Sequence, residues 1–545
     1  MTGWLLVAVA VVAVMILVWR TERDARRMVF ALAATATLAA FVSLLSGDLE
    51  RALLWAALIA FGIAGLSRVK FHHSARALIV ADAPLLFAGT VPFFFTQYRR
   101  MMASVMAGAA LLAVAAAAVT FWCAGSVLSL SQSASLIAGG IALSALAYRW
   151  NGGLAAFRAA VTEPGSYLST FAASVADVRS WWRTAPLNPV AMARAPLALI
   201  PAVAGRSPVK PDILLIQHES IFDPRLFGLP VTPDVANFLS PPEGSHGGLD
   251  VEIFGGGSWQ SEFSVMTGIA SGLFGTDAYF LFQRGAGRFK HNLPAELARL
   301  GYRTSLIASC RRGFLNYGAF YAGMGMDRLI FSDDLPPPFV VDAFERTHSD
   351  AQFLPAALQI VARAAAGAVG PQFHAILTNS NHGPHDRRLA PAQFEPQRAF
   401  ALQSAGDAEY AEYYARLAET AQAWAEAKPR FFAGASARPT LIVHYGDHQP
   451  VLARRIEASL GLAPEAGRTF RTFYAVETVN FDLCAAMPAA LPIAYLGTSV
   501  LRASGLPLDD ISATRAAMLA DAAGRHDAEP ALLRTLVDRG LVDLG

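Results

Sequence analysis

Charged residues are scarce in this chain. Only 16% of its 545 residues are Asp, Glu, Lys or Arg, whereas 54% are hydrophobic. A soluble protein of this length carries about 25% charged residues. The shortage therefore excludes a chain that is soluble throughout and indicates that part of it lies in lipid.

A block of like charge is also missing. The formal net charge is only +2 and no Lys/Arg cluster occurs, so composition gives no reason to expect a nucleic-acid partner. Cysteine is equally rare, with Cys123 in an apolar run and two others, Cys310 and Cys484, that could in principle pair. Because no C-x-x-C framework occurs, cysteine usage says little about compartment, and packed thiols are favoured.

The apolar excess is concentrated at the start of the chain. Residues 1–150 hold five acidic and eleven basic residues between long apolar runs, whereas the portion from 211 onward has ordinary charge density. At roughly 335 residues, that portion is long enough to bury its own core. The sequence thus predicts a transmembrane domain over 1–150, a juxtamembrane helix and linker over 151–210, and a globular domain over 211–545.

About five stretches are suited to span a bilayer, which takes about 20 helical residues. They are Trp4–Trp19, Val29–Leu45, Ala52–Leu66, Val105–Cys123 and the shorter Ala134–Tyr148. The first lacks a basic start and is followed by more spans, so it is interpreted as a retained helix rather than a signal peptide. Ala77–Phe95 is also apolar, but Asp82 is costly inside a membrane, which favours an interfacial or re-entrant segment over a sixth span.

The orientation of these spans depends on their number. The basic loops Arg20–Arg27 and Arg68–Arg76 are expected in the cytoplasm by the positive-inside rule. With five spans the globular domain would then also be cytoplasmic, and with six spans it would lie outside. In the connector, Val175–Arg183 with its Trp181-Trp182 pair fits a helix at the lipid surface or an ordinary connecting helix. Ala185–Pro211, rich in Pro and Ala, fits a linker.

Beyond the linker, short apolar runs alternate with helical patterns. The expected strands are Ile213–Gln217, Thr304–Ala308, His374–Thr378, Thr440–His444 and Thr472–Val476, and the expected helices include Leu293–Leu300, Phe353–Ala366 and Glu409–Ala427. This alternation predicts an α/β domain with a mostly parallel sheet covered on both faces. In such sheets ligands bind beyond the carboxyl ends of the strands.

Polar motifs follow several of these strands. Glu219 follows the first strand and is either a ligand for a hard cation or a capping residue. Asp447 and His448 follow Thr440–His444 and offer one ion an oxygen and a nitrogen, a mixture that suits zinc or manganese better than magnesium. His382 follows His374–Thr378 and is a candidate general acid, whereas His385 is interpreted as a loop residue without a role.

Ser258 follows three glycines and begins a helical pattern. At a helix N-terminus beside a divalent cation, its hydroxyl could ionise and attack phosphorus. The alternative is an N-cap whose capping box is completed by Ser261 or Glu262. The motif by itself does not decide between the two.

Taken together, HES (218–220), GGGSWQSEF (255–263), SNHGP (380–384) and GDHQP (446–450) resemble the lipoteichoic acid synthase and phosphoglycerol transferase family of the alkaline phosphatase/sulfatase superfamily. YAGMGMDRLIF (321–331) and SDAQFL (349–354) resemble further segments of that family. The resemblance covers about residues 210–500. It implies a sulfatase-like catalytic domain outside the cytoplasm, a divalent metal (typically Mn²⁺, with Mg²⁺ or Zn²⁺ as alternatives) on Glu219, Ser258, Asp447 and His448, and a covalent intermediate on Ser258.

This sequence departs from the family where the family contacts its phosphoglycerol. The segment before Tyr321 keeps Asn316 but has Tyr317 where the family has Arg, and Arg311 or Arg312 would have to supply the missing charge. No C-x-P-x-R sulfatase signature occurs. The resemblance implies a transferase that moves phosphoglycerol or a related head group from a phospholipid to an extracytoplasmic glycan. Phosphoethanolamine transfer, phosphodiester hydrolysis and a non-catalytic membrane scaffold are the alternatives.

Overall fold

The computed structural model describes residues 2–87, 90–122, 127–177, 182, 185–339, 348–432, 438–463, 465, 467–521 and 524–545. The chain divides into two compact units. One contains Met1–Phe87 and Phe94–Ala185, and the other contains Ala88–Phe93 and Pro186–Gly545. Cys123 and most of the connector segment from Val175 to Arg183 lie outside the described residues.

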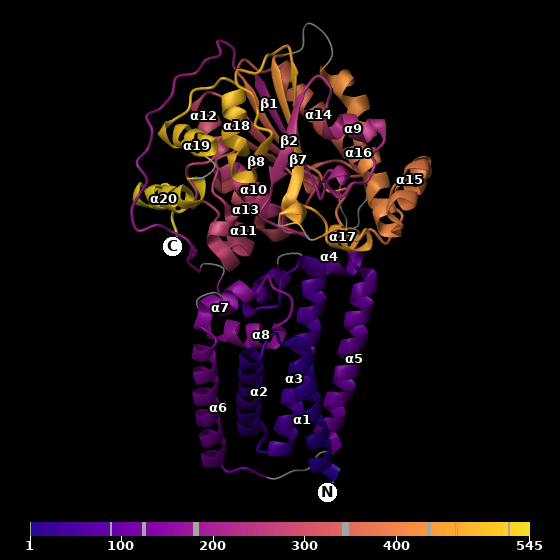
Figure 1. The fold of residues 1–545 in the computed structure, drawn as a ribbon, viewed down its shortest axis with the longest axis vertical. Helices are drawn as coiled ribbons and strands as arrows, with labels where there is room; N and C mark the ends of the chain where they lie inside the picture. Colours follow the sequence, from indigo (N-terminus) through magenta and orange to yellow (C-terminus); the bar gives the residue numbers. More distant parts are fainter. Residues whose placement is uncertain are drawn as a thin grey trace. The chain divides into compact units, whose positions relative to one another are not determined.

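The first unit is helical (Figure 1). Its elements are α1 Thr2–Thr21, α2 Ala25–Ser46, α3 Leu49–Ser74, η1 Val80–Phe87, α4 Thr90–Gln97, which extends into the second unit, α5 Arg99–Trp122, α6 Leu130–Trp150, α7 Gly153–Ala160 and α8 Tyr167–Ala176. Within the described residues, five helices (α1, α2, α3, α5 and α6) are long and apolar enough to cross a membrane. The Ala77–Phe95 segment forms the short η1 and the start of α4, neither of which is long enough to span.

Local capping and apolar packing explain this bundle. Asp24 and Asp48 accept hydrogen bonds from backbone N–H groups of the first turns of α2 and α3, which satisfies donors that a helix start leaves unpaired. Val14, Val18 and Ala31 pack with residues of α3 in one apolar cluster. Phe30 packs with Phe157 of α7 in another.

The second unit is built on one eight-stranded sheet with the order β4-β3-β5-β1-β6-β7-β2-β8. The strands are β1 Asp212–His218, β2 Ser245–Asp250, β3 Arg303–Ala308, β4 Arg328–Ile330, β5 Gln372–Leu377, β6 Thr440–Gly446, β7 Arg471–Val479 and β8 Ala490–Pro492. Strands β4, β3, β5, β1 and β6 are parallel, whereas β7 is antiparallel to both β6 and β2. The expected α/β fold with a mostly parallel sheet is therefore confirmed, with β7 as the antiparallel exception.

Helices cover both faces of this sheet. Helices α10, α12, α13, α18 and α19 lie on one side of it and α9, α14, α15 and α16 on the other (Figure 1). The helices are α9 Pro233–Leu239, α10 Ser258–Thr267, α11 Leu281–Arg284, α12 Leu293–Arg299, α13 Tyr317–Gly323, α14 Asp350–Ala366, α15 Glu395–Ala405, α16 Ala408–Phe432, α17 Leu452–Ser459, α18 Leu496–Ala503, α19 Asp510–Ala520 and α20 Arg525–Asp538. The 3₁₀ turns are η3 Pro224–Phe227, η4 Ser271–Phe280, η5 Phe314–Asn316, η6 Ser332–Asp334, η8 Ala392–Phe394, η9 Arg468–Phe470 and η10 Ile493–Tyr495.

The segment expected to be a linker is tied to this α/β unit. Residues 186–211 contain no helix or strand, yet the Leu187 N–H donates to the Leu544 carbonyl and Val203 forms an isolated bridge with Leu508. Elsewhere in the unit, Cys310 and Cys484 are both free thiols and half-buried. A disulfide between them is therefore absent.

Candidate active site

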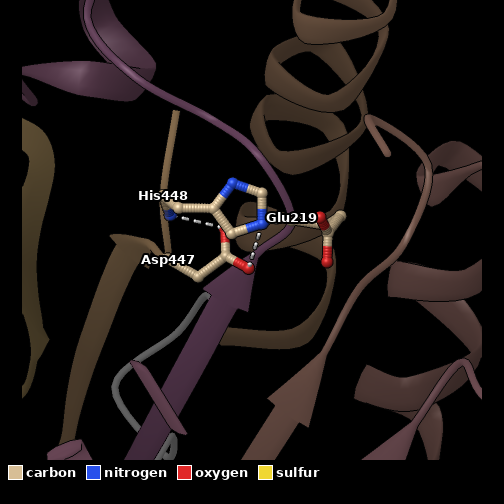
Figure 2. Close-up of side chains that lie close together, drawn as sticks. All are labelled: Glu219, Asp447 and His448. Atoms are coloured by element: carbon tan, nitrogen blue, oxygen red, sulfur yellow. Dashed lines mark hydrogen bonds and ion pairs between the residues drawn. The ribbon is translucent and has the colours of Figure 1, made fainter. Parts of the chain in front are cut away.

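The two carboxylates and the imidazole of the site follow the ends of two neighbouring parallel strands. In the register of β1 and β6, His218 lies opposite Gly446, so the residues that follow, Glu219 and Asp447, leave the sheet side by side. A side chain at Gly446 would lie only 1.8 Å from the Ile221 carbonyl oxygen, so this close approach requires glycine. Ligand atoms of Glu219, Asp447 and His448 all lie within 4.8 Å of one another, and all three residues are buried (Figure 2).

The nucleophile candidate joins this cluster from a third element. Gly257, with φ +100°, begins α10 without a side-chain cap, and Ser258 occupies the first helical position. The Ser258 hydroxyl donates to Glu219 Oε2 at 2.8 Å and lies 3.3 Å from His448 Nε2. Ser261 is not part of a capping box, because its hydroxyl donates to the Asp447 carbonyl at 2.6 Å. The hydroxyl of Ser258 thus faces the acidic cluster and does not cap its helix.

The donor set fits a divalent cation. Asp447 Oδ2 is buried and has no hydrogen-bond partner within the described part of the chain. His448 Nδ1 lies 3.0 Å from the Gln449 carbonyl, and its Nε2 lies 3.3 Å from Glu219 Oε1 and 3.6 Å from Asp447 Oδ2. With Nδ1 donating to that carbonyl, Nε2 is the nitrogen that would face a bound ion. Two carboxylates, one imidazole nitrogen and a nearby hydroxyl are ligands that manganese or zinc accepts.

The electrostatics of the cluster also favour a cation. Burial raises the pKa of Asp447 to about 7, with the Glu219 charge acting in the same direction. Burial opposes ionisation of His448, but the charge of Asp447 and the contact with Glu219 raise its pKa to about 9. For Glu219, burial is outweighed by the charge of His382 and the hydrogen bond from His448, and its pKa is lowered. The cluster thus retains positive charge against two carboxylates, a role that a bound divalent ion would take over.

The loop after β5 carries the two histidines of the SNHGP segment. The His382 ring is half-buried, its Nδ1 lies 2.6 Å from the Gly383 carbonyl, and its charge acts on Glu219 as described above. His385 is buried, with Nε2 2.9 Å from the Asn381 carbonyl and its ring against Tyr413. The arrangement brings His382 near the acidic cluster and makes His385 a packing residue.

The four residues proposed to contact the substrate differ in their surroundings. Tyr317 is buried and its hydroxyl donates to Glu262 Oε1 at 2.7 Å. Asn316, in the left-handed region at φ +69°, donates to the Phe282 carbonyl at 2.7 Å. Arg312 is exposed and paired with Asp334, and Arg311 is half-buried. Tyr317 therefore faces the interior of the domain, whereas the two arginines are nearer its surface.

Sequence reasoning missed a buried acid next to the candidate nucleophile. Glu262 lies one helical turn after Ser258 and accepts hydrogen bonds from Tyr317, from Tyr321 at 2.5 Å and from the Gln217 amide at 3.2 Å. Burial raises its pKa to about 7. The only signal in the sequence was the SEF segment, in which Glu262 was weighed as a member of a capping box.

A second acidic and imidazole group, His291, Glu296 and Asp509, is also compact. Its charges are already balanced, because Arg299 donates to Asp509 at 2.8 Å and Arg515 approaches His291 Nδ1 at 3.4 Å. Asp509 also caps α19. This group joins α12 to α19 and is a structural ion cluster.

Comparisons with known proteins agree with this fold. A sequence model of the sulfatase family matches residues 211–470. A protein of Haemophilus influenzae, described only as uncharacterized, is 22% identical over 317 residues, which cover 56% of this chain and 55% of the relative. The chain thus spans about half the length of this curated relative.

Several solved structures are similar at low identity, among them the following three. The lipooligosaccharide phosphoethanolamine transferase EptA of Neisseria meningitidis has a TM-score of 0.53, 12% identity and coverage of 91% of this chain and 98% of its own. The phosphoglycerol transferase GacH of Streptococcus pyogenes (TM-score 0.45, 13% identity, 61% and 89% coverage) and the lipoteichoic acid synthase LtaP of Listeria monocytogenes (0.43, 16%, 56% and 76%) are also similar.

The EptA similarity extends over both the helical and the α/β unit and concerns the fold alone. The family match, in turn, includes Glu219, Ser258, Asp447 and His448. The α/β domain of this chain is therefore sulfatase-like over residues 211–470.

Proposed function

We propose that this protein is a membrane-anchored, metal-dependent transferase that moves phosphoglycerol, or a related phospho-head-group, from a phospholipid to an extracytoplasmic glycan. One observation carries the proposal. Buried Glu219, Ser258, Asp447 and His448, from three separate elements, meet around the Ser258 hydroxyl. In such a site the serine hydroxyl is suited to attack phosphorus, because a nearby divalent cation makes it a stronger nucleophile. The serine, and not water, then attacks in the first step.

The proposed reaction has two displacement steps. A divalent ion such as Mn²⁺, held by Glu219, Ser258, Asp447 and His448, would lower the pKa of the serine hydroxyl and balance the charge of the phosphoryl oxygens. Ser258 Oγ gives its proton to water and bonds to phosphorus, the bond from phosphorus to the diacylglycerol oxygen breaks, and His382 gives that oxygen a proton. A glycan hydroxyl then bonds to phosphorus and gives its proton to His382, the bond from phosphorus to Ser258 Oγ breaks, and Ser258 regains a proton from water.

The position of Ser258 suits an in-line attack. It occupies the first turn of α10, where backbone N–H groups lack partners within the helix and attract the negative phosphoryl oxygens. The glycines at 255–257 all have positive φ, a conformation that favours glycine, and their lack of side chains leaves the approach to the hydroxyl open. Arg311 and Arg312 remain the proposed source of positive charge for the head group, and Asn316 and Tyr317 act by shaping the segment that carries them.

We further propose that the α/β domain lies outside the cytoplasm. With five spans, an N-terminus in the cytoplasm leaves the residues after α6 on the outer face, where a lipid donor and a glycan acceptor meet. The basic loops near Arg23 and Lys70 then lie on that face too, against the positive-inside rule. Salt bridges from Arg23 to Glu163 and from Lys70 to Asp82 reduce the cost of this arrangement.

The test uses the full-length protein in liposomes that contain phosphatidylglycerol labelled in its head group. Wild type with Mn²⁺ should release diacylglycerol and leave the label on the protein, and Ser258→Ala should do neither. Liposomes with labelled phosphatidylethanolamine separate the phosphoethanolamine alternative, and free labelled head group without a covalent intermediate would indicate plain hydrolysis. Normal turnover by Ser258→Ala would refute the proposal.

A further inference from the structure

The loop that carries His382 has no regular structure of its own. No helix or strand lies between the end of β5 at Leu377 and the start of η8 at Ala392. A loop of this length has many accessible conformations, so something outside it must fix the position of His382. The candidates are the groups that hydrogen-bond to the loop backbone.

One buried arginine holds the middle of this loop. Arg416 of α16 is only 1% exposed, and its guanidinium donates to three loop carbonyls: those of His382 (3.1 Å), Pro384 (3.2 Å) and Arg387 (3.0 Å). The planar guanidinium presents its donors in a fixed fork, so three carbonyls bound at once define the path of the loop. His382 itself is among the residues held.

A buried glutamate one turn earlier holds the end of the loop. Glu412 accepts from the backbone N–H groups of Leu389 (2.6 Å) and Ala390 (3.0 Å) and from Arg416 Nε at 2.8 Å. Its other oxygen accepts from Arg398 Nε at 2.7 Å, and Arg398 also donates to the Ala390 carbonyl. Charge-assisted hydrogen bonds of this kind are about twice as strong as neutral ones, so this contact fixes the loop end firmly.

The start of the loop is held from the same helix through Asp350. The Ser380 N–H donates to Asp350 Oδ1 at 3.1 Å, and Thr420 donates to Asp350 Oδ2 at 3.1 Å. Glu412, Arg416 and Thr420 follow one another at intervals of four and therefore lie on one face of α16. That face contacts the His382 loop, directly or through Asp350, along its whole length.

We propose that Arg416, with Glu412 and Arg398, is a positioning device that aims His382 at the reacting phosphoryl group. The proposal deepens the function proposed above and rests on it, because His382 is the proton donor of that reaction. Arg416 touches no substrate in this scheme. It acts through the loop backbone, so its loss should change the rate of the chemical step more than substrate or metal binding.

The test is a double-mutant cycle on the full-length protein. Arg416→Lys keeps one positive charge beside Glu412 but cannot serve three carbonyls at once. With His382 present, kcat should fall by about tenfold to a hundredfold, while KM and the affinity for Mn²⁺ change by less than about threefold. In the His382→Ala background, the same substitution should lower kcat by less than about twofold.

The control is an exposed ion pair with the same i, i+4 spacing as the buried pair of Glu412 and Arg416. Arg534 and Asp538 form an i, i+4 ion pair on α20 with both side chains about 40% exposed, so Arg534→Lys should leave kcat, KM and metal affinity unchanged. Thr420→Val, which removes one donor to Asp350 without removing a charge, is a milder second variant. It should lower kcat by less than Arg416→Lys while the melting temperature stays near that of wild type.

Two results would overturn the positioning role. One is an equal loss of kcat for Arg416→Lys with and without His382, which would mean a general effect on the fold. The other is an unchanged kcat in both Arg416→Lys and Thr420→Val. These results differ from the one that would refute the proposed function. That result is normal turnover by Ser258→Ala, which is measured outside the double-mutant cycle.

Discussion

Glu262 provides a test of how α10, the helix that begins at Ser258, is stabilised. Its carboxyl is 1% exposed and receives hydrogen bonds from Tyr317, Tyr321 and Gln217 but has no cationic partner among the described residues. Burial raises its pKa from an ordinary 4.5 to about 7, and the three donors offset only part of that effect. Glu262→Gln keeps the shape of the side chain and removes its ability to ionise.

The sign and size of the change in stability with pH follow from the linkage between proton binding and folding. Because the pKa is higher in the folded state, the folded protein holds this proton more tightly, and stability falls as the pH rises from about 4.5 to about 7. Between pH 5 and pH 8, the contribution of Glu262 to the free energy of unfolding falls by about 2.5 kcal/mol in wild type. In Glu262→Gln this contribution does not change with pH. With an unfolding entropy of about 0.7 kcal/mol/K for a domain of this size, the difference corresponds to about 3 to 4 °C.

The assay is thermal unfolding of the full-length protein in detergent, followed by tryptophan fluorescence at pH 5 and pH 8. The difference between the melting temperatures of Glu262→Gln and wild type should shift by about 3 to 4 °C in favour of the variant between the two pH values. Most of the effect of titrating the metal-site residues is common to both proteins and is removed in this difference. Glu243→Gln, at an exposed position, controls for the loss of one carboxylate. An offset between variant and wild type that is the same at both pH values would refute the reasoning.

Three further predictions concern the metal, the glycine turn and the topology. Asp447→Asn should lower Mn²⁺ affinity by about a hundredfold or more, measured as metal content after dialysis, and equal metal in variant and wild type would contradict the assigned ligand. Gly257→Ala should lower kcat at least about tenfold, because Gly257 has φ +100° and a Cβ there would lie 2.6 Å from Gln260 Nε2; an unchanged kcat would argue against a role for this turn. In a chain without native cysteines, a cysteine at Ser129 should resist an impermeant thiol reagent in intact cells and one at Asp521 should react, and the reverse pattern would place the α/β domain in the cytoplasm.

The strands that sequence predicted are those with continuous apolar runs. β1, β3, β5, β6 and β7 were all expected, because their interiors are buried on both faces. β2, with the sequence SHGGLD, has two glycines and little apolar surface, and β4 and β8 are only three residues long. The antiparallel direction of β7 was not predictable, because a buried apolar run has the same pattern in either direction.

The proximity of Glu219 and Asp447 was predictable, because each residue directly follows an expected strand. Glu219 follows β1 and Asp447 follows β6, so the principle that parallel strands end at one edge brings them together without knowledge of the rest of the fold. Arg416 and Glu412 were not predictable as partners of the His382 loop. An Arg four residues after a Glu on a helix normally indicates an exposed ion pair, and only the burial of α16 changes that interpretation.

The first turn of α10 shows why the motif around Ser258 stayed ambiguous. Ser258, Ser261 and Glu262 have the residue types and spacing of a capped helix start, and nothing local distinguishes that arrangement from a catalytic one. Their actual partners are Glu219, the Asp447 carbonyl and the tyrosines of α13, all distant in sequence. Three such contacts within two turns fix the direction of the Ser258 hydroxyl. The same contacts give Tyr317 a place in this network, because its hydroxyl donates to Glu262. The proposed nucleophile and the segment that carries Tyr317 are thus linked through the buried Glu262 carboxyl. If both roles hold, substitutions at Tyr317 should alter turnover at Ser258 as well as substrate choice.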